Sequence, residues 1–224
     1  MITADELHNI AVWSRELTCD EREYARRGIV EKAFAKGAYI CHRGDNLNSW
    51  TGVISGLVKL STFSHGGKAV TLAGISAGGW FGEGAVLKNE ARRYDLIALR
   101  DTRIALMNRP TFFWLFENSA AFNRFLVRQF NERLGQFIAL VEYDRMLDAP
   151  ARVARAIAWL FNPIFYPQLP PYLEITQEEI GLLSGVSRQV ANKSLKLLER
   201  KGLLRLERGG ITVLDPGRLL RFDE

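Results

Sequence analysis

The chain has 224 residues, of which 47% are hydrophobic, and its formal net charge at pH 7 is +5. This composition excludes disorder over most of the chain, and the length suits one large domain or two smaller ones. The positive charge favours an acidic partner such as nucleic acid. The sequence shows neither an apolar run of roughly 20 residues nor a secretory leader pattern, so we expect a cytoplasmic protein without membrane contact. Cys19 and Cys41 offer neither a disulfide framework nor a four-thiolate cluster.

Residues 1–30 are predicted to form a helical arm that packs through an apolar stripe of Leu7, Ile10, Ala11, Val12 and Trp13. Residues 31–109 are predicted to form a β-barrel, because a period of two replaces the helical period and turn residues recur at short intervals. These turns are Lys36-Gly37, Arg43-Gly44-Asp45, Ser55-Gly56, His65-Gly66-Gly67, Ala77-Gly78-Gly79 and Arg100-Asp101. The predicted barrel interior comprises Val53, Leu57 to Leu60, Val70, Leu72, Ile97, Leu99, Ile104 and Leu106.

Residues 110–147 return to a helical period. Pro110 suits a first helical turn, and Ser119 is a suitable cap for a long helix that reaches about Leu147. Its apolar positions recur at threes and fours along roughly 40 Å of helix. Such a stripe can pack on its own domain, but a seam of this kind between two small domains is more often a dimer interface. We therefore predict a dimer with an interface formed by Phe122, Leu126, Phe130, Leu134, Phe137 and Val141.

Residues 148–224 are predicted to form a winged helix-turn-helix domain. Pro150 opens a helix over residues 151–161, and a proline-rich loop follows from Pro163 to Pro171. Thr176 and Glu179 form a capping box, and Gly185 marks the turn before the next helix. Two strands, over residues 203–206 and 211–214, form the hairpin that serves as the wing.

The second helix of the motif is predicted to read DNA. Val190, Ala191, Leu195 and Leu198 fall on its core side, and hydrogen-bond donors fall on the other. Such a helix enters the major groove, where Arg or Lys pairs with guanine and Gln or Asn pairs with adenine. The predicted DNA-binding residues are Thr176, Ser187, Arg188, Gln189, Asn192, Lys193, Lys196, Arg200 and Arg208, and Arg205 is a further candidate for a phosphate contact.

This order of elements, with Ile175-Thr176, Glu179-Ile180-Gly181 and Gly185-Val186-Ser187-Arg188, resembles the cyclic AMP receptor protein/FNR (Crp/Fnr) family of bacterial transcription regulators over residues 20–214. The resemblance implies an α+β fold: an N-terminal cyclic-nucleotide-binding-like β-barrel (jelly roll), a long dimerisation helix and a C-terminal winged helix-turn-helix. It also implies a homodimer that binds double-stranded DNA and acts on RNA polymerase.

The resemblance further assigns a candidate effector pocket. Gly82 and Glu83, followed by Arg93, match the spacing of the family's phosphate-binding cassette, in which the glutamate takes a ribose hydroxyl and the arginine pairs with the cyclic phosphate. A short helix over residues 84–87 would add its N-terminal amides. The candidate pocket residues are Gly82, Glu83, Gly84, Ala85, Arg93, Tyr94, Phe137 and Ile138.

The sequence departs from the cyclic-AMP-binding pattern at several of these positions. Tyr94 stands where a serine or threonine follows the arginine, and Phe137 and Ile138 stand where a Thr-Ser pair touches the adenine. We therefore favour an ion pair between Glu83 and Arg93, in a pocket that is empty or holds another small effector, over cyclic nucleotide binding. On the recognition helix, Gln189 and Lys193 replace a glutamate and an arginine, so the family's target sequence does not transfer.

Metal cofactors are not expected. Iron–sulfur members of the family need four cysteines, and adjacent Cys41 and His42 point opposite ways on a strand, which disfavours haem or a metal ion.

The leading interpretation is a homodimeric DNA-binding transcription regulator whose barrel senses an unidentified small effector or has lost sensing. An alternative is a regulator that responds to a cyclic nucleotide through Glu83 and Arg93. A nucleotide-sensing subunit that binds protein instead of DNA is another. We do not expect an enzyme, because the sequence shows no Ser-His-Asp set or P-loop, and His8, His42 and His65 are scattered.

Overall fold

The computed structural model describes residues 2–63, 69–166 and 169–222, so the predicted turn at His65 to Gly67 lies outside the described residues. The chain forms two compact units, Met1–Asn131 and Glu132–Glu224. The division between them falls inside a single long helix, α5 (Ala120–Met146).

The first unit begins with the predicted helical arm, which comprises α1 (Ala4–Ile10), a 3₁₀ helix η1 (Val12–Glu16) and α2 (Cys19–Arg27). Each α-helix starts at a capping box, formed by Thr3 with Glu6 and by Thr18 with Glu21. These boxes satisfy backbone donors that have no partner inside a helix. The predicted apolar stripe is buried at Leu7, Ile10, Ala11 and Trp13.

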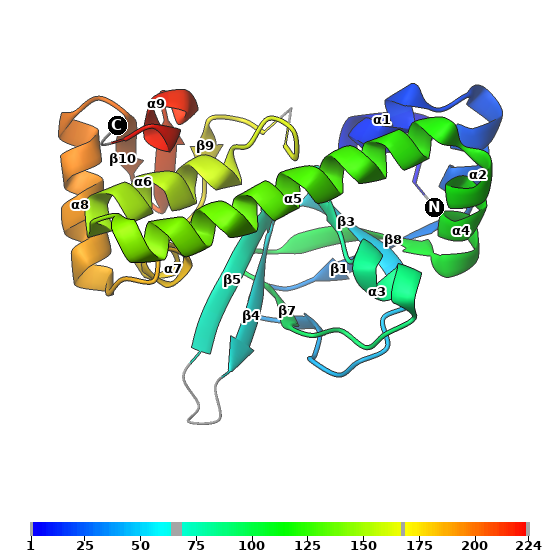
Figure 1. The fold of residues 1–224 in the computed structure, drawn as a ribbon, viewed down its shortest axis with the longest axis horizontal. Helices are drawn as coiled ribbons and strands as arrows, with labels where there is room; N and C mark the ends of the chain where they lie inside the picture. Colours follow the sequence, from blue (N-terminus) through cyan, green and yellow to red (C-terminus); the bar gives the residue numbers. More distant parts are fainter. Residues whose placement is uncertain (1, 64–68, 167–168, 223–224) are drawn as a thin grey trace. The chain divides into compact units, whose positions relative to one another are not determined.

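The barrel consists of two four-stranded antiparallel sheets among the described residues (Figure 1), ordered β1-β8-β3-β6 and β2-β7-β4-β5. The strands are β1 (Ile29–Phe34), β2 (Tyr39–Cys41), β3 (Ser49–Ser55), β4 (Leu57–Phe63), β5 (Ala69–Ser76), β6 (Trp80–Phe81), β7 (Asp95–Ala98) and β8 (Thr102–Asn108). Gly56 turns the chain between β3 and β4 with a φ of +94°, a conformation that favours glycine.

Most of the predicted barrel interior is buried, namely Val53, Leu57, Val58, Leu60, Ile97, Leu99, Ile104 and Leu106. The prediction was wrong for Val70 and Leu72, whose exposed fractions are 42% and 38%. Both residues lie on β5, the edge strand of its sheet, which pairs only with β4. The period-two pattern is therefore present there, but it places these two side chains on a face that the rest of the barrel does not cover.

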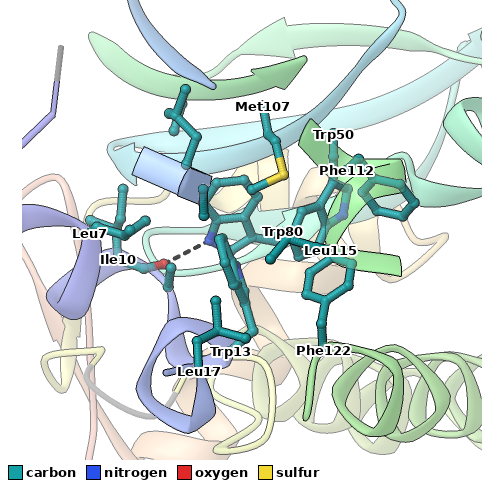
Figure 2. Close-up of a cluster of buried hydrophobic side chains, with 14 of the residues drawn as sticks. Leu7, Ile10, Trp13, Leu17, Trp50, Trp80, Met107, Phe112, Leu115 and Phe122 are labelled. Carbon is teal, nitrogen blue, oxygen red and sulfur yellow. Dashed lines mark hydrogen bonds between the residues drawn. The ribbon is translucent and has the colours of Figure 1, made fainter. Parts of the chain in front are cut away.

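The arm joins the barrel through a buried aromatic cluster, defined here as Trp13, Trp50, Trp80, Phe112 and Phe122 (Figure 2). The ring centroid of Trp13 lies 5.3 Å from that of Trp50, 5.2 Å from that of Trp80 and 5.6 Å from that of Phe122. Tilted and edge-to-face contacts of this kind are the favoured geometries of aromatic pairs. The dashed line in Figure 2 marks the 2.8 Å hydrogen bond that Trp80 Nε1 donates to the carbonyl oxygen of Ile10.

Two helices follow the barrel. In α4 (Arg109–Asn118), Asn108 accepts from the backbone of Thr111 and Pro110 lies in the first turn, as predicted. Ser119 Oγ then accepts from the backbone N–H of Phe122 in α5, which confirms the predicted cap. A short helix on the barrel, α3 (Glu83–Lys88), precedes β7.

The predicted dimer seam on α5 changes character along the helix. Phe122 and Leu126 lie in the core of their own unit, with exposed fractions of 0% and 2%, so their assignment to a dimer interface was wrong. The physical reason is the aromatic cluster, which uses the start of the same apolar stripe for intrachain packing. The later members of the stripe are exposed: Phe130 (39%), Leu134 (59%), Phe137 (52%) and Val141 (54%).

The second unit contains α6 (Ala149–Leu160), β9 (Tyr172–Leu173), α7 (Gln177–Leu183), α8 (Arg188–Arg200), β10 (Leu204–Glu207), β11 (Gly210–Val213) and α9 (Pro216–Leu220). Asp148 caps α6 and Pro150 lies in its first turn. The predicted hairpin is present, with Leu204 opposite Val213 and Glu207 opposite Gly210. A third strand, β9, was not predicted; it follows directly after the predicted proline-rich loop and pairs with β11.

Replacing Trp13 by alanine is expected to destabilise the first unit by about 3–5 kcal/mol, because it removes the aromatic side chain that joins the arm to the barrel. Urea unfolding monitored by circular dichroism measures the change. The matched control is Tyr24→Ala, since Tyr24 is 41% exposed and stacks on Trp114 at the surface. Its cost should be about 1 kcal/mol. Equal losses from the two substitutions would contradict the role given to Trp13.

Candidate nucleic-acid interface and effector cassette

The helix-turn-helix is set by short-range hydrogen bonds. Thr176 Oγ1 accepts from the N–H of Glu179, and Glu179 Oε2 accepts from the N–H of Thr176, which is the predicted capping box. Gly185 has a φ of +66° in the turn. Sequence reasoning did not identify the role of Gly181, where a Cβ atom would lie 2.9 Å from the carbonyl oxygen of Val186. The close approach of α7 to the turn therefore requires glycine at this position.

The recognition helix α8 has the two faces that its sequence predicts. Ser187 Oγ accepts from the N–H of Val190 and caps the helix. The buried face comprises Ala191, Ser194, Leu195 and Leu198, and the half-buried Val190 lies beside it. The side chains of Arg188, Gln189, Lys193, Lys196 and Arg200 are exposed.

Asn192 is placed differently from the other predicted DNA contacts. It is half-buried, and its Oδ1 atom is buried without a hydrogen-bond partner among the described residues. The acceptor that an adenine contact would use therefore points away from solvent. Asn192 lies at the margin of the donor face and not at its centre.

The wing is attached to the recognition helix by a side chain that sequence reasoning missed. Glu199 Oε1 accepts from the N–H of Leu206 at 2.7 Å and so joins α8 to β10. Arg208 is exposed at the turn of the hairpin. The side chain of Arg205 is 63% exposed, and its Nε lies 3.9 Å from Glu207 Oε1.

A groove of about 420 Å³ lies between the wing and the start of each helix of the motif. Its lining includes Thr176, Arg188, Glu207 and Gly209. The predicted DNA-binding residues Thr176 and Arg188 thus share one concave surface with the wing. Both belong to the N-terminal ends of their helices, where the helix dipole favours an anion.

In the barrel, the glutamate of the candidate cassette already accepts a hydrogen bond from another part of the barrel. Gly82 precedes α3 in the left-handed conformation, with a φ of +89°. Glu83, which is only 4% exposed, accepts a hydrogen bond from Trp50 Nε1 at 3.3 Å. This carboxylate is thus hydrogen-bonded to the protein's own core.

The expected ion pair between Glu83 and Arg93 is wrong. The side chain of Arg93 is 78% exposed, and its Nη2 lies 3.0 Å from Glu90 Oε2. The buried arginine of the cassette is its neighbour Arg92, which is 2% exposed and donates from Nη2 to the carbonyl oxygen of Ser49 at 2.8 Å. Adjacent side chains on this non-helical segment diverge, so spacing alone does not show which of the two arginines is buried.

The other candidate pocket residues do not complete a cyclic nucleotide site. Gly84 is exposed, and Ala85 and Tyr94 are half-buried. Phe137 and Ile138 are apolar and exposed on α5. The residues present therefore do not fit a cyclic nucleotide, since the arginine at the cassette spacing faces solvent and the glutamate is bound to Trp50.

Cys41 and His42, the pair considered as metal ligands, lie in different environments. Burial raises the pKa of the Cys41 thiol to about 11, which disfavours the thiolate that a metal would need. His42 stacks on Tyr39 at the surface, with ring centroids 4.2 Å apart. The described residues contain no group of three or more His, Cys, Asp or Glu side chains arranged to hold a metal ion. Over the same ranges, no helix combines the length and apolar character needed to cross a membrane.

Comparisons with known proteins place both units in one family. A model described as "Cyclic nucleotide-binding domain" matches residues 31–119, and one described as "Crp-like helix-turn-helix domain" matches residues 151–222. The cyclic AMP receptor protein of Thermus thermophilus is 26% identical over 203 residues, covering 91% of this chain and 92% of the relative. The chain belongs to the Crp/Fnr family of transcription regulators.

Other Crp/Fnr proteins agree with this assignment. The cAMP-activated global transcriptional regulator CRP of Haemophilus influenzae is 27% identical over 181 residues, covering 78% of this chain and 79% of the relative. A CRP-family transcriptional regulator of Thermus thermophilus has a similar structure, with a TM-score of 0.61 and 25% identity, over 85% of this chain and 95% of that one. FixK2 from Bradyrhizobium japonicum has a similar fold, with a TM-score of 0.71 and 18% identity, over 88% of this chain and 98% of that one.

Proposed function

We propose that this Crp/Fnr regulator binds an inverted-repeat operator as a homodimer. The observation that carries the proposal is the exposed donor face of α8, opposite a fully buried face of Ala191, Leu195 and Leu198. Two such helices related by a dimer axis would enter successive major grooves about 34 Å apart. Thr176, Ser187 and Arg208 would contact phosphates beside the groove. RNA polymerase is the expected protein partner of a regulator bound in this way.

The exposed part of α5 supports a homodimer. Phe130, Leu134, Phe137 and Val141 are between 39% and 59% exposed, and together they form an apolar stripe on one helix. An apolar stripe of this length is costly in water unless it is covered, and a second copy of the same helix covers it in coiled-coil fashion.

We further propose that the barrel senses an effector other than cyclic AMP or has lost sensing. The names of the curated relatives favour the alternative, a regulator that responds to cyclic AMP. The outward position of Arg93 and the hydrogen bond between Glu83 and Trp50 weigh against it in this chain.

The first test of DNA binding is a selection from random duplexes with wild type, Arg188→Ala and Gln189→Glu. Wild type should select an inverted repeat. Arg188→Ala should lose about 1–3 kcal/mol of binding free energy and relax the preference at one position in each half-site. Gln189→Glu should change the preferred base, because a glutamate only accepts hydrogen bonds. Sites without an inverted repeat, or unchanged bases with Gln189→Glu, would refute this account of α8.

Lys196 and Arg200 lie farther along α8 and are expected to contact phosphates. Removing either charge should weaken binding to all DNA sequences alike. It should also reduce the magnitude of the slope of log affinity against log salt concentration by about one per lost phosphate contact. The control is Lys36→Ala, which removes an exposed charge from a turn of the barrel. An equal change in slope for the control would show that the effect reflects net charge only.

The dimer is tested by the double substitution Leu134→Asp, Phe137→Asp. Charges in a buried apolar seam cost several kcal/mol, so the variant should sediment as a monomer where wild type is a dimer. Ile164→Asp changes another apolar side chain, 51% exposed, outside the stripe and serves as the control. A wild type that is monomeric at micromolar concentration would overturn the proposal.

Calorimetry with cyclic AMP tests the effector proposal. We expect no binding at micromolar concentration, because polar groups of a buried adenine left without partners each lose about 1–3 kcal/mol. Micromolar binding that also tightens DNA binding would establish the alternative.

A further inference from the structure

The two buried charged residues of the cassette are both bound to one short segment of β3. Glu83 accepts from Trp50 Nε1 at 3.3 Å. Arg92 Nη2 donates to the carbonyl oxygen of Ser49 at 2.8 Å and to Thr51 Oγ1 at 3.4 Å. Glu83 and Arg92 are therefore hydrogen-bonded to three consecutive residues of β3, Ser49 to Thr51.

Arg92 also packs against Gly82, the first residue of the cassette. A Cβ atom on Gly82 would lie 1.8 Å from Arg92 Nη1, so the guanidinium group occupies the space beside the cassette's first residue. The side chain is 2% exposed, and its Nε and Nη1 atoms have no hydrogen-bond partner among the described residues. A buried guanidinium with unpaired donors is costly, and its position is therefore held by the packing and by its bonds to β3.

From this segment the contacts continue to α5. The ring centroid of Trp50 lies 5.4 Å from that of Phe122 and 6.3 Å from that of Phe125. Phe122, labelled in Figure 2, is fully buried in the first turn of α5. Its backbone N–H donates to Ser119 Oγ, the cap of the helix. The indole of Trp50 therefore touches the cassette through its N–H and the start of α5 through its ring.

We propose that Glu83, Arg92 and Trp50 form a lock, in which Trp50 and Arg92 are positioning residues that hold the first two turns of α5. A ligand hydroxyl that displaces Trp50 Nε1 from Glu83 frees the indole from its present hydrogen bond. An anion that draws Arg92 Nη2 away from Ser49 and Thr51 removes the bonds on either side of Trp50. The start of α5 then loses the aromatic partner that fixes it. This inference concerns the first unit alone and does not depend on the proposed DNA binding.

Hydrogen exchange of the full chain, measured by mass spectrometry without DNA or ligand, tests the lock. Trp50→Phe keeps an aromatic ring and removes the N–H, and Glu83→Ala removes the acceptor. Each should raise exchange about fivefold in peptides covering residues 120–126 and 49–55, because a buried polar partner is left unpaired. Glu83→Gln keeps an acceptor oxygen and should stay within about twofold of wild type. If Glu83→Ala does not fold, Trp50→Phe and Glu83→Gln carry the test.

The matched controls are Glu90→Ala and Arg93→Ala, which break the exposed ion pair of the same cassette. They should leave residues 120–126 unchanged. The variants are repeated in the Leu134→Asp, Phe137→Asp background, so that altered association is not mistaken for an altered lock. The proposal is overturned if the controls match Trp50→Phe. It is also overturned if exchange in β1 rises as much as in residues 120–126, because that pattern reports general destabilisation.

Discussion

The packing of Trp50 is the interaction on which the first unit depends. Its ring lies 4.6 Å from that of Trp80 and 5.3 Å from that of Trp13, so one side chain of β3 joins the N-terminal arm, the barrel and the first turn of α5. A buried indole N–H usually finds a hydrogen-bond partner, and for Trp50 the barrel supplies Glu83. The acid that the family resemblance assigns to a ligand is in this chain hydrogen-bonded to the aromatic cluster.

Arg92 and Arg93 show that environment decides the role of a charge. Both lie in the cassette, but one is buried against Ser49 and Gly82, and the other is paired with Glu90 in solvent. An exposed ion pair contributes little to stability, whereas a buried guanidinium constrains every group around it. On α8 the side chains of Arg188 and Lys196 are exposed and so incur no such desolvation cost.

The parts of the structure that the sequence predicts best are those with local causes. The capping box at Thr176, the turn at Gly185 and the cap at Ser187 each depend on residues within three or four positions, and each is confirmed. The parts that it misses depend on neighbours distant in sequence. Nothing near Val70 reveals that β5 is an edge strand, and nothing near Phe122 reveals that Trp13 and Trp50 cover it. The period of an apolar pattern shows that a face is covered, but not by what.

The helix α5 illustrates the consequence. One apolar stripe changes character along the helix, because Phe122 and Leu126 are buried within the chain whereas Phe130, Leu134, Phe137 and Val141 are exposed. The exposed part of the stripe therefore runs over roughly 17 Å of helix, from Phe130 to Val141 at 1.5 Å per residue, and not over the full length that the pattern suggests. Because α5 runs without a break from Ala120 to Met146, the buried and the exposed parts of the stripe belong to one helix. Helical periodicity alone therefore cannot show where packing within the chain ends and an exposed apolar surface begins.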